Sequence, residues 1–533
     1  MAAGEIDAAI AGRTVPGLFA DMLGARPDAV AVRWRPPGGD TATETMTWVQ
    51  YADRACRVAA GLRALGVQPG DRIVLMMRNR FEFYPADMGV LLAGATPISI
   101  YNSSSPEQIE YLAGHSEAVA AIVGDVGMLE RFLKVRSELP GLRNLVLVDD
   151  PDGLASADVV PFADLLGAAP VDLAEAAGRV KPDDLLTLIY TSGTTGPPKG
   201  VMLSHRNLCW VLESMARATG EPIAGWRQVS FLPMAHIAER LMTHYFHIGE
   251  GTDVTVCPEP TELASYLREV RPEHFLGVPR VWEKIHAGIT AAVAADPEKQ
   301  AAFEGALEVG HRADEVRVTG QELPPDLAAA WERVDSEVFA NVRAMVGLDQ
   351  LRIALTGAAP IPRPVFDFFR AIGVPLSEIY GLSECTGPMT WSPKSRPGTV
   401  GPPIPGQEMK LLEDGEVCCR GGNVFSGYLK DPERTAEMLD DEGWLHTGDI
   451  GRVEDGDYLR IVDRKKELII TAGGKNISPA NLEAAIKSFP LIGQACTIGD
   501  GRAYMTALIV LDPDVAPAWA RSRGIEFASL ADL

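Results

Sequence analysis

The chain has 533 residues and a mass of 57.2 kDa. It is too long for a single hydrophobic core, so we expect at least two folding units. Its hydrophobic fraction of 46% and charged fraction of 23% are typical of globular proteins and exclude disordered and fibrous classes. With 49 basic and 72 acidic side chains, the net charge is −23. So acidic a surface repels phosphate backbones and argues against nucleic-acid binding, although a local pocket can still bind small anions.

Neither the cysteines nor the apolar segments indicate an exported or membrane-embedded protein. The seven cysteines are scattered, odd in number and without CxxC spacing, which favours free thiols in a reducing compartment. The first 14 residues lack the basic-then-apolar pattern of a signal peptide. Apolar runs such as residues 89–95 and 118–124 are much shorter than the roughly 20 residues of a membrane span. We therefore expect a cytoplasmic protein.

The first 150 residues alternate between helix and strand patterns. Apolar residues recur at helical spacing from position 48 to 65, before Gly66 and the apolar run 73–77. The alternation then predicts a helix over 87–92, a strand over 95–100, a helix over 106–114 and a strand over 118–123. Such repetition indicates α/β layers around a mostly parallel sheet. Residues 149–184 predict a surface connection with short helical pieces.

Three later regions have patterns of their own. Long charged helices are predicted between residues 271 and 349, most clearly over 298–316 and 327–345. Residues 398–460 are Gly-rich, with short strands and turn pairs such as Asp414-Gly415, which indicates a small β-barrel-like unit. A strand–turn–helix–strand pattern begins at Asp463. We expect an α/β fold with an N-terminal domain over 1–462, made of two layered subdomains and the β unit, and a small α+β C-terminal domain over 463–533.

The most informative segment is LLTLIYTSGTTGPPKG, at residues 185–200. An apolar strand leads into a loop that consists of Thr191, Ser192, Gly193, Thr194, Thr195 and Gly196. Glycines let backbone N–H groups approach an anion, the hydroxyls add donors, and Lys199 adds a charge, so the loop suits phosphate. It is not a Walker A loop, because Pro198 and Gly200 flank the lysine. A flexible hydroxyl-rich linker is the alternative, which the full residue order disfavours.

The segment YTSGTTGPPKG resembles the nucleotide-binding loop of the adenylate-forming superfamily, which includes acyl-CoA synthetases, luciferases and peptide-synthetase adenylation domains. Three further motifs match in the family's order, namely YGLSE at 380–384, WLHTGD at 444–449 and DRKKE at 463–467. Within the superfamily, the chain is most similar to the long-chain fatty acyl-CoA synthetases. The supporting segments are PISIYNSSSPEQIEY at 97–111, VPRVWEK at 278–284 and LIITAGGKNISP at 468–479.

For ATP, the resemblance implies a phosphate cradle, a metal site and an adenosine site. The loop with Lys199 would hold the β- and γ-phosphates, and Glu384 with Thr191 would bind Mg²⁺ through hard oxygen ligands. Asp449 would accept hydrogen bonds from the ribose hydroxyls, and Tyr380 would stack on adenine. The other residues of the implied nucleotide site are Ser192, Gly193, Thr194, Thr195, Gly196, Gly357, Ala358, Ala359, Gly381, Ser383 and Arg464.

Each of these side chains also has an ordinary structural explanation when it is taken singly. Glu384 could be a solvated carboxylate, Asp449 a turn residue and Tyr380 a core aromatic. The motifs in combination favour the functional interpretation.

For the acyl group, residues 231–240 (FLPMAHIAER) resemble the motif whose aromatic residue lines the acyl entrance, which places His236 there. A partly buried histidine without such a role is the alternative. Amino-acid-activating relatives have an aspartate near this point, and its absence here predicts a plain carboxylic acid. The resemblance further implies that the C-terminal domain turns about Asp463. It would then present coenzyme A with Gly473, Gly474 and Lys475.

The chain departs from the family near its end. The family has an essential lysine near its C-terminus, whereas the last lysine here is Lys487. We therefore expect either a truncated, incomplete C-terminal domain or an impaired first half-reaction. The implied activity is ATP-dependent formation of a fatty acyl-AMP and transfer of the acyl group to coenzyme A, with long-chain acids as substrates. Its catalytic residues would be Lys199, Glu384, Arg464 and His236.

Other functions stay open at this point. The acyl group could pass to a carrier-protein thiol, the chain could be a catalytically impaired binding fragment, or the acid could be medium-chain or aromatic. The oligomeric state is also open, a homodimer included, as is transient peripheral contact with a membrane that holds a fatty substrate.

Overall fold

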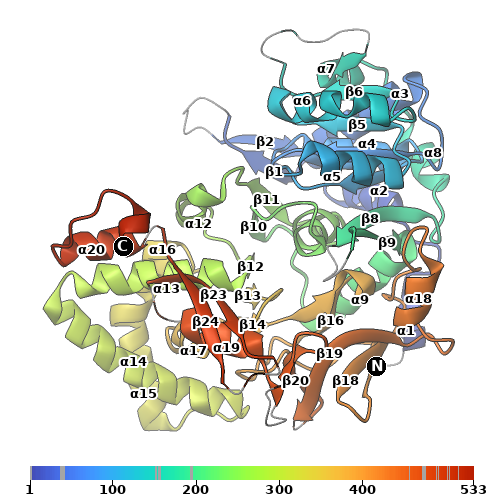
Figure 1. The fold of residues 1–533 in the computed structure, drawn as a ribbon. Coiled ribbons are helices and arrows are strands. Elements are labelled where there is room, and N and C mark those ends of the chain that lie inside the picture. Colours follow the sequence, from blue (N-terminus) through green and yellow to red (C-terminus); the bar gives the residue numbers. More distant parts are fainter. Residues whose placement is uncertain are drawn as a thin grey trace.

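The computed structural model describes residues 3–36, 43–150, 153, 158–191, 196–454, 456–470, 476–487, 489, 491–500, 502, 504–513 and 515–533. Figure 1 shows layered α/β subdomains at the top and left, a small antiparallel sheet (orange) at the lower right and a C-terminal segment (red) beside it. The expected α/β class is confirmed.

A five-stranded parallel sheet forms the first subdomain, in the order β4-β3-β5-β6-β7. Its strands are β3 (Arg72–Met76), β4 (Thr96–Ser99), β5 (Ala120–Val123), β6 (Asn144–Leu147) and β7 (Val159–Pro161). The helices between and beside them are α3 (Trp48–Ala64), α4 (Phe83–Leu92), α5 (Pro106–His115), α6 (Val126–Lys134), α7 (Phe162–Leu166) and α8 (Leu173–Gly178). The predicted alternation is confirmed, and the connection over 149–184 contributes the edge strand β7 as well as short helices.

Two further sheets form the second subdomain. One has the order β10-β11-β1-β2, with β1 (Val30–Trp34), β2 (Glu44–Thr47), β10 (Arg227–Ser230) and β11 (Asp253–Val256). The other is parallel, with β12 (His274–Gly277), β13 (Ile353–Thr356) and β14 (Leu376–Glu378). The N–H of Glu273 donates to the Arg227 carbonyl at 3.1 Å and joins the two sheets. Preceding or flanking helices are α1 (Ala3–Ala9), α2 (Val15–Ala25) and α12 (Leu263–Val270).

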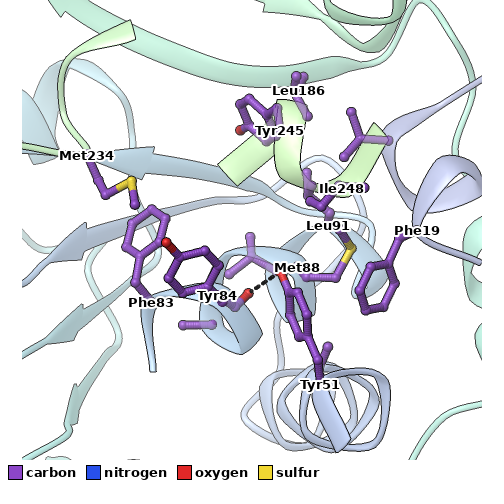
Figure 2. Packing of buried hydrophobic residues seen from close by; sticks show 14 of the residues in the cluster. Phe19, Tyr51, Phe83, Tyr84, Met88, Leu91, Leu186, Met234, Tyr245 and Ile248 are labelled. Carbon is purple, nitrogen blue, oxygen red and sulfur yellow. Dashed lines mark hydrogen bonds between the residues drawn. The ribbon is translucent and has the colours of Figure 1, made fainter. Parts of the chain in front are cut away.

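A buried aromatic core lies between α3, α4 and the helical segment that precedes β11. Figure 2 shows Phe19, Tyr51 and Tyr84 in this core, where the Tyr51 hydroxyl donates to the Tyr84 carbonyl at 3.1 Å. The rings of Phe19 and Tyr51 meet edge to face, with centroids 4.7 Å apart. These contacts hold α3 and α4 together behind the strands that carry the candidate site.

The charged helices over 271–349 are confirmed, with one difference. The structure has α13 (Pro279–Ala294), α14 (Pro297–Val318), α15 (Pro325–Val334) and α16 (Ala340–Val346). The pattern over 327–345 predicts one helix, whereas a π-helical segment at Asp335–Phe339 separates α15 from α16. A π-helical segment differs from an α-helix in its i→i+5 hydrogen bonds and not in residue type, so the sequence pattern does not reveal it.

The remaining elements lie towards the C-terminus. A hairpin of β15 (Tyr380–Leu382) and β16 (Gly387–Thr390) follows α17 (Arg363–Ala371) and β14. The predicted β unit is an antiparallel sheet of β17 (Glu408–Leu411), β18 (Glu416–Arg420), β19 (Leu445–Glu454) and β20 (Tyr458–Arg464), with α18 (Pro432–Met438) beside it. Beyond it lie β21 (Ile469–Ile470), β22 (Asn476–Ile477), α19 (Pro479–Lys487), β23 (Ile492–Ile498), β24 (Thr506–Leu511) and α20 (Val515–Ser522).

No bilayer-crossing segment is found among the described helices, because none of them combines the necessary length with the necessary apolar character.

Trp282 of α13 is fully buried and gives the second subdomain a testable anchor. Its Nε1 donates to the carbonyls of Gly277, at 3.0 Å, and Leu355, at 3.2 Å, and its ring packs edge-on against Phe275 and Phe369. We expect Trp282→Ala to lower the free energy of unfolding by about 3–5 kcal/mol, measured by urea denaturation followed by circular dichroism. Trp282→Phe keeps much of the packing and should cost less. An alanine variant as stable as the wild type would contradict this account.

Candidate functional site

The predicted phosphate loop connects β8 (Leu185–Thr191) to β9 (Lys199–Ser204). Thr191 and Lys199 are paired in the antiparallel register, so the two ends of the loop are placed opposite each other. Gly196 has a φ of +89°, in the region that favours glycine. The Thr187 hydroxyl donates to the Pro97 carbonyl at 2.7 Å and fixes β8 against β4. The predicted Ser192, Gly193, Thr194 and Thr195 lie outside the described residues.

Strand β9 is hydrogen-bonded along both edges. On the side away from β8, the N–H of Met202 donates to the Gly427 carbonyl at 3.0 Å, and the N–H of Leu429 donates to the Gly200 carbonyl at 2.8 Å. This pairing brings Tyr428, from the segment before α18, next to the start of β9. A region more than 200 residues away in sequence therefore becomes part of the candidate site.

Lys199 lies over the ring of Tyr428, with Nζ 5.0 Å from the ring centroid, a cation–π geometry. Burial lowers the pKa of Lys199, and the positive charge of Arg434 lowers it further, whereas Glu384 and Asp431 raise it. A bound phosphate would add negative charge beside the ammonium group and favour its charged form. This environment therefore suits an anion.

Glu384 is buried in the single turn Ser383–Cys385 and contacts the same tyrosine, Tyr428. Its Oε1 accepts a hydrogen bond from the Tyr428 hydroxyl at 2.7 Å, and its carbonyl accepts one from the N–H of Phe425 at 2.8 Å. Its other carboxylate oxygen makes no hydrogen bond within the described part of the chain. Tyr428 thus connects the predicted phosphate-binding lysine to the predicted metal-binding carboxylate.

The oxygen donors at this point fit Mg²⁺. Magnesium is bound by one or two protein oxygens together with phosphate oxygens and water. The Glu384 oxygen that has no hydrogen bond among the described residues matches that need, and the resemblance adds the Thr191 hydroxyl. Among the described residues, no group of three or more His, Cys, Asp and Glu side chains could hold a metal ion. The pattern therefore fits an ion that arrives with a nucleotide.

Tyr380 and Asp449, predicted for the adenosine, are in direct contact. The Tyr380 hydroxyl donates to Oδ2 of Asp449 at 2.5 Å, and Nε of Arg464 lies 3.5 Å from Oδ1. Arg464 is paired with Asp449 in the β19–β20 register. Burial raises the pKa of Asp449, while Tyr380 and Arg464 favour its charged form. A buried carboxylate with a tyrosine beside it offers hydrogen-bond acceptors and a ring face to a nucleoside.

The turn Gly357-Ala358-Ala359 follows β13 and lies beside Tyr380. The N–H of Ile379 donates to the Thr356 carbonyl at 2.9 Å, which sets the two segments side by side. A Cβ on Gly357 would lie 2.7 Å from the Ile379 carbonyl oxygen, so only glycine fits. Ala358 has a φ of +69°, a strained conformation for an alanine. Ala358 and Ala359 are exposed, and the turn is open to a ligand.

Gly381 and Ser383 complete this edge. A Cβ on Gly381 would lie 1.7 Å from the Gly387 carbonyl oxygen, which makes glycine necessary for the β15–β16 hairpin. Ser383 is half-buried next to Glu384. The described part of the predicted nucleotide set thus gathers around β9, β15 and β19.

His236, predicted at the acyl entrance, is half-buried and stands just before α10 (Ile237–Glu239). Its Nδ1 accepts a hydrogen bond from the N–H of Ala238 at 3.1 Å. Burial lowers the pKa of His236, so the ring is neutral at pH 7 and the proton lies on Nε2. The next residue, Ile237, packs in one apolar cluster with Cys385, the neighbour of Glu384.

The predicted pivot and coenzyme A segment lie after β19. Asp463 is buried in β20, and its carboxylate accepts hydrogen bonds from the N–H groups of Arg464, at 2.7 Å, and Ala480, at 3.3 Å. It therefore connects β20 to the start of α19. Gly473, Gly474 and Lys475 lie outside the described residues. Arg280 of α13 forms an ion pair with the buried Asp512, which ties the C-terminal segment to the helical region.

One residue of the site was not anticipated. Tyr428 contacts both Lys199 and Glu384, yet in sequence it is an aromatic residue in a Gly-rich stretch before Asp431-Pro432. Only the pairing of its neighbours with β9 shows its role.

Comparison with known proteins shows which family and which relatives this chain is similar to. Residues 19–429 match the family described as AMP-binding enzyme, and residues 466–523 match its C-terminal domain. Long-chain-fatty-acid–CoA ligase FadD15 of Mycobacterium tuberculosis is 35% identical over 507 residues, which are 92% of this chain and 81% of that one. Long-chain-fatty-acid–CoA ligase ACSBG2 of Rattus norvegicus is 35% identical over 491 residues, 88% of this chain and 73% of that one.

A third relative is more similar over a shorter stretch. The M. tuberculosis protein fadD11, which carries a provisional name as a fatty-acid–CoA ligase, is 44% identical over 378 residues. These are 69% of this chain and 66% of the relative, so the match leaves about a third of fadD11 uncovered.

Solved structures share the fold at low identity. A fatty acyl CoA synthetase of M. tuberculosis superposes with a TM-score of 0.67 and 23% identity, over 97% of this chain and 92% of that one. The anthranilate CoA ligase AuaEII, bound to anthranoyl-AMP, gives a TM-score of 0.72 and 20% identity, over 96% and 90%.

The contact between Tyr380 and Asp449 can be tested in the protein without ligands. Because the Tyr380 hydroxyl favours the charged carboxylate, we expect Tyr380→Phe to raise the already elevated pKa of Asp449 further. Infrared difference spectroscopy of ¹³C-labelled aspartate would follow the titration, with Asp449→Asn to assign the band. An unchanged or lower pKa would show that the hydroxyl does not stabilise the charge.

Proposed function

Because the chain belongs to the AMP-binding enzyme family, we propose that it activates a long-chain fatty acid with ATP through an acyl-AMP and transfers the acyl group to coenzyme A. One observation carries the proposal. Lys199, Tyr428 and Glu384 meet at one end of β9, close in the fold to the buried pair Tyr380–Asp449. A site for phosphates and metal thus adjoins a site for a nucleoside. The names of the relatives support the acid and the acceptor.

In the first step, the fatty carboxylate attacks the α-phosphorus of ATP, and the bond to pyrophosphate breaks. The acid is ionised at neutral pH, so the site needs no general base. Lys199 and the loop amides would stabilise the charge that develops on the phosphates. When bound at Glu384 and Thr191, Mg²⁺ would neutralise phosphate charge as a Lewis acid. Asp449 and Tyr380 would hold the adenosine in place.

In the second step, the coenzyme A thiol attacks the acyl carbonyl carbon, and the bond from this carbon to the phosphate oxygen breaks. AMP leaves, and the thiol proton passes to phosphate or water. We propose that residues 463–533 turn about Asp463 between the steps, bringing Gly473, Gly474 and Lys475 to the site and excluding water. The separate family matches over 19–429 and 466–523 support domains at 1–462 and 463–533. His236 would line the acyl entrance, and Arg464 would contact the ribose and phosphate.

The proposal also concerns the small-molecule partners of the chain and its compartment. Its small-molecule partners would be a fatty acid, ATP with Mg²⁺, and coenzyme A. Six of its seven cysteines are buried as free thiols, which supports a reducing, cytoplasmic compartment.

A catalytically impaired binding protein is the alternative. The comparisons do not favour it, because relatives that match most of this chain are named as CoA ligases. The two alternatives differ in whether they release pyrophosphate from ATP.

The proposal predicts that the chain forms acyl-CoA, AMP and pyrophosphate from ATP, Mg²⁺, coenzyme A and long-chain acids. Mass spectrometry of reactions with acids of graded length, with and without coenzyme A, would detect acyl-AMP and acyl-CoA. A parallel reaction would start from synthetic acyl-AMP. Thioester formed only from acyl-AMP would show that the first step is lost. Transfer of the acyl group to a carrier-protein thiol, and not to coenzyme A, would show that the carrier protein is the acceptor. No product under any condition would favour the binding protein.

Lys199 should matter for the first step. We expect Lys199→Ala to lower the rate of pyrophosphate release by about 10²-fold, because one preorganised electrostatic contact to the phosphates is removed. Coupled pyrophosphate assays would measure the effect. Lys299→Ala, which removes an exposed lysine of α14, is the matched control and should act like the wild type. Equal rates of pyrophosphate release in the two variants would show that Lys199 does not stabilise the phosphates.

A further inference from the structure

Glu239 is a buried carboxyl that the proposed mechanism does not use. It ends α10, with 2% of its surface exposed. The hydroxyls of Ser230 and Thr243 each donate to its Oε1 at 2.7 Å, and the backbone of Phe231 and Leu232 also favours its charged form. Both hydroxyls donate, so the surroundings match an ionised carboxylate.

The backbone behind Glu239 is firmly anchored. A π-helical segment, Arg240–Tyr245, follows it directly, and such segments are frequent at functional sites. Arg240 is fully buried, ion-paired with Asp87 of α4, and donates from Nε to the Tyr245 hydroxyl at 2.8 Å. His244 Nε2 lies 2.8 Å from the other oxygen of Asp87. This buried network fixes the helix to α4, so that Glu239 is a rigid support for what lies in front of it.

What lies in front is the segment 231–236, which leads to His236. Its start is held by Glu239 and by Asn79, whose Nδ2 donates to the Ser230 hydroxyl at 3.1 Å and the Leu232 carbonyl at 2.8 Å. Met234, in the middle, is buried near Phe83 and Tyr84, as Figure 2 shows. The far end continues into Ile237, which packs with Cys385. The segment therefore runs from β10 to the candidate nucleotide site.

We propose that Glu239 is a positioning residue for the acyl substrate, because the hydrogen bond from Ser230 to its carboxylate fixes the start of residues 231–236 and so supports the conformation that places His236 at the acyl entrance. This inference rests on the proposed function and deepens it. A purely structural glutamate would affect stability and every kinetic constant together, whereas a positioning residue affects acid binding selectively.

The protonation of Glu239 gives the inference a pH signature. Burial raises the pKa of Glu239 to about 7, although the Ser230 and Thr243 hydroxyls and the nearby backbone act in the opposite direction. Among the described residues, Tyr84 of α4 and Cys257 after β11 are titratable groups whose charge couples to it. The Asp87–Arg240–His244 network lies behind it. Below pH 7 the protonated carboxyl has fewer acceptor positions for its donors, so the KM for the acid should rise as the pH falls through 7.

The test compares Glu239→Gln with the wild type between pH 6 and 8. We expect the variant's KM for the fatty acid to be about tenfold higher at pH 8, the effect of one lost charged hydrogen bond, with kcat and the KM for ATP nearly unchanged. The KM ratio of variant to wild type should fall towards 1 at pH 6. Glu250→Gln, a half-buried glutamate of α11 (Phe246–Glu250) whose pKa burial also raises, is the matched control.

Hydrogen exchange gives a second readout that does not depend on turnover. Amides of residues 231–236 should exchange faster in Glu239→Gln, with β13 unchanged, and in the wild type they should lose protection at pH 6 after correction for intrinsic rates. If both glutamine variants behave alike, or if Glu239→Gln changes all constants and all amides together, the inference is wrong. A wild type that makes no acyl-CoA would contradict the proposed function instead, and exchange would still report whether Glu239 holds the segment.

Discussion

The pairing of β9 along both of its edges is the constraint on which the candidate site depends. Strand β8 fixes one edge and the segment around Tyr428 fixes the other, so that the lysine at the start of β9 meets an aromatic ring and, through it, Glu384. Backbone hydrogen bonds set this geometry with little dependence on side chains. The sheet therefore determines the position of the candidate nucleotide site.

Buried carboxyl groups are a second feature of the molecule. The chain carries a net charge of −23, yet two carboxyls of the candidate site region are removed from water and have specific partners. Asp449 has Tyr380 and Arg464, and Glu239 has hydroxyl and backbone donors. Burial raises the pKa of both groups and donors oppose it, so each carboxyl is sensitive to what binds beside it. The net charge of the chain does not predict the environment of such buried carboxyl groups.

Much of the fold could be predicted from the sequence, because apolar periodicity directly reflects burial. The helix over Trp48–Ala64, the strand over Arg72–Met76 and the long helix Pro297–Val318 lie where their patterns place them. The nucleotide motifs were recognisable because they are local. Tyr428 was missed because its partners Lys199 and Glu384 are distant from it in sequence, and no residue pattern marks the π-helical segments.

One isotope experiment tests the central claim most directly. A long-chain acid labelled with ¹⁸O in its carboxyl group would be incubated with the protein, ATP, Mg²⁺ and coenzyme A, and the nucleotide product would be analysed by mass spectrometry. Attack of the carboxylate on the α-phosphorus, followed by loss of AMP from the acyl carbon, leaves one carboxyl oxygen on phosphorus. We predict AMP with one ¹⁸O for each acyl-CoA formed. Unlabelled AMP, or ADP with label in free phosphate, would contradict the account.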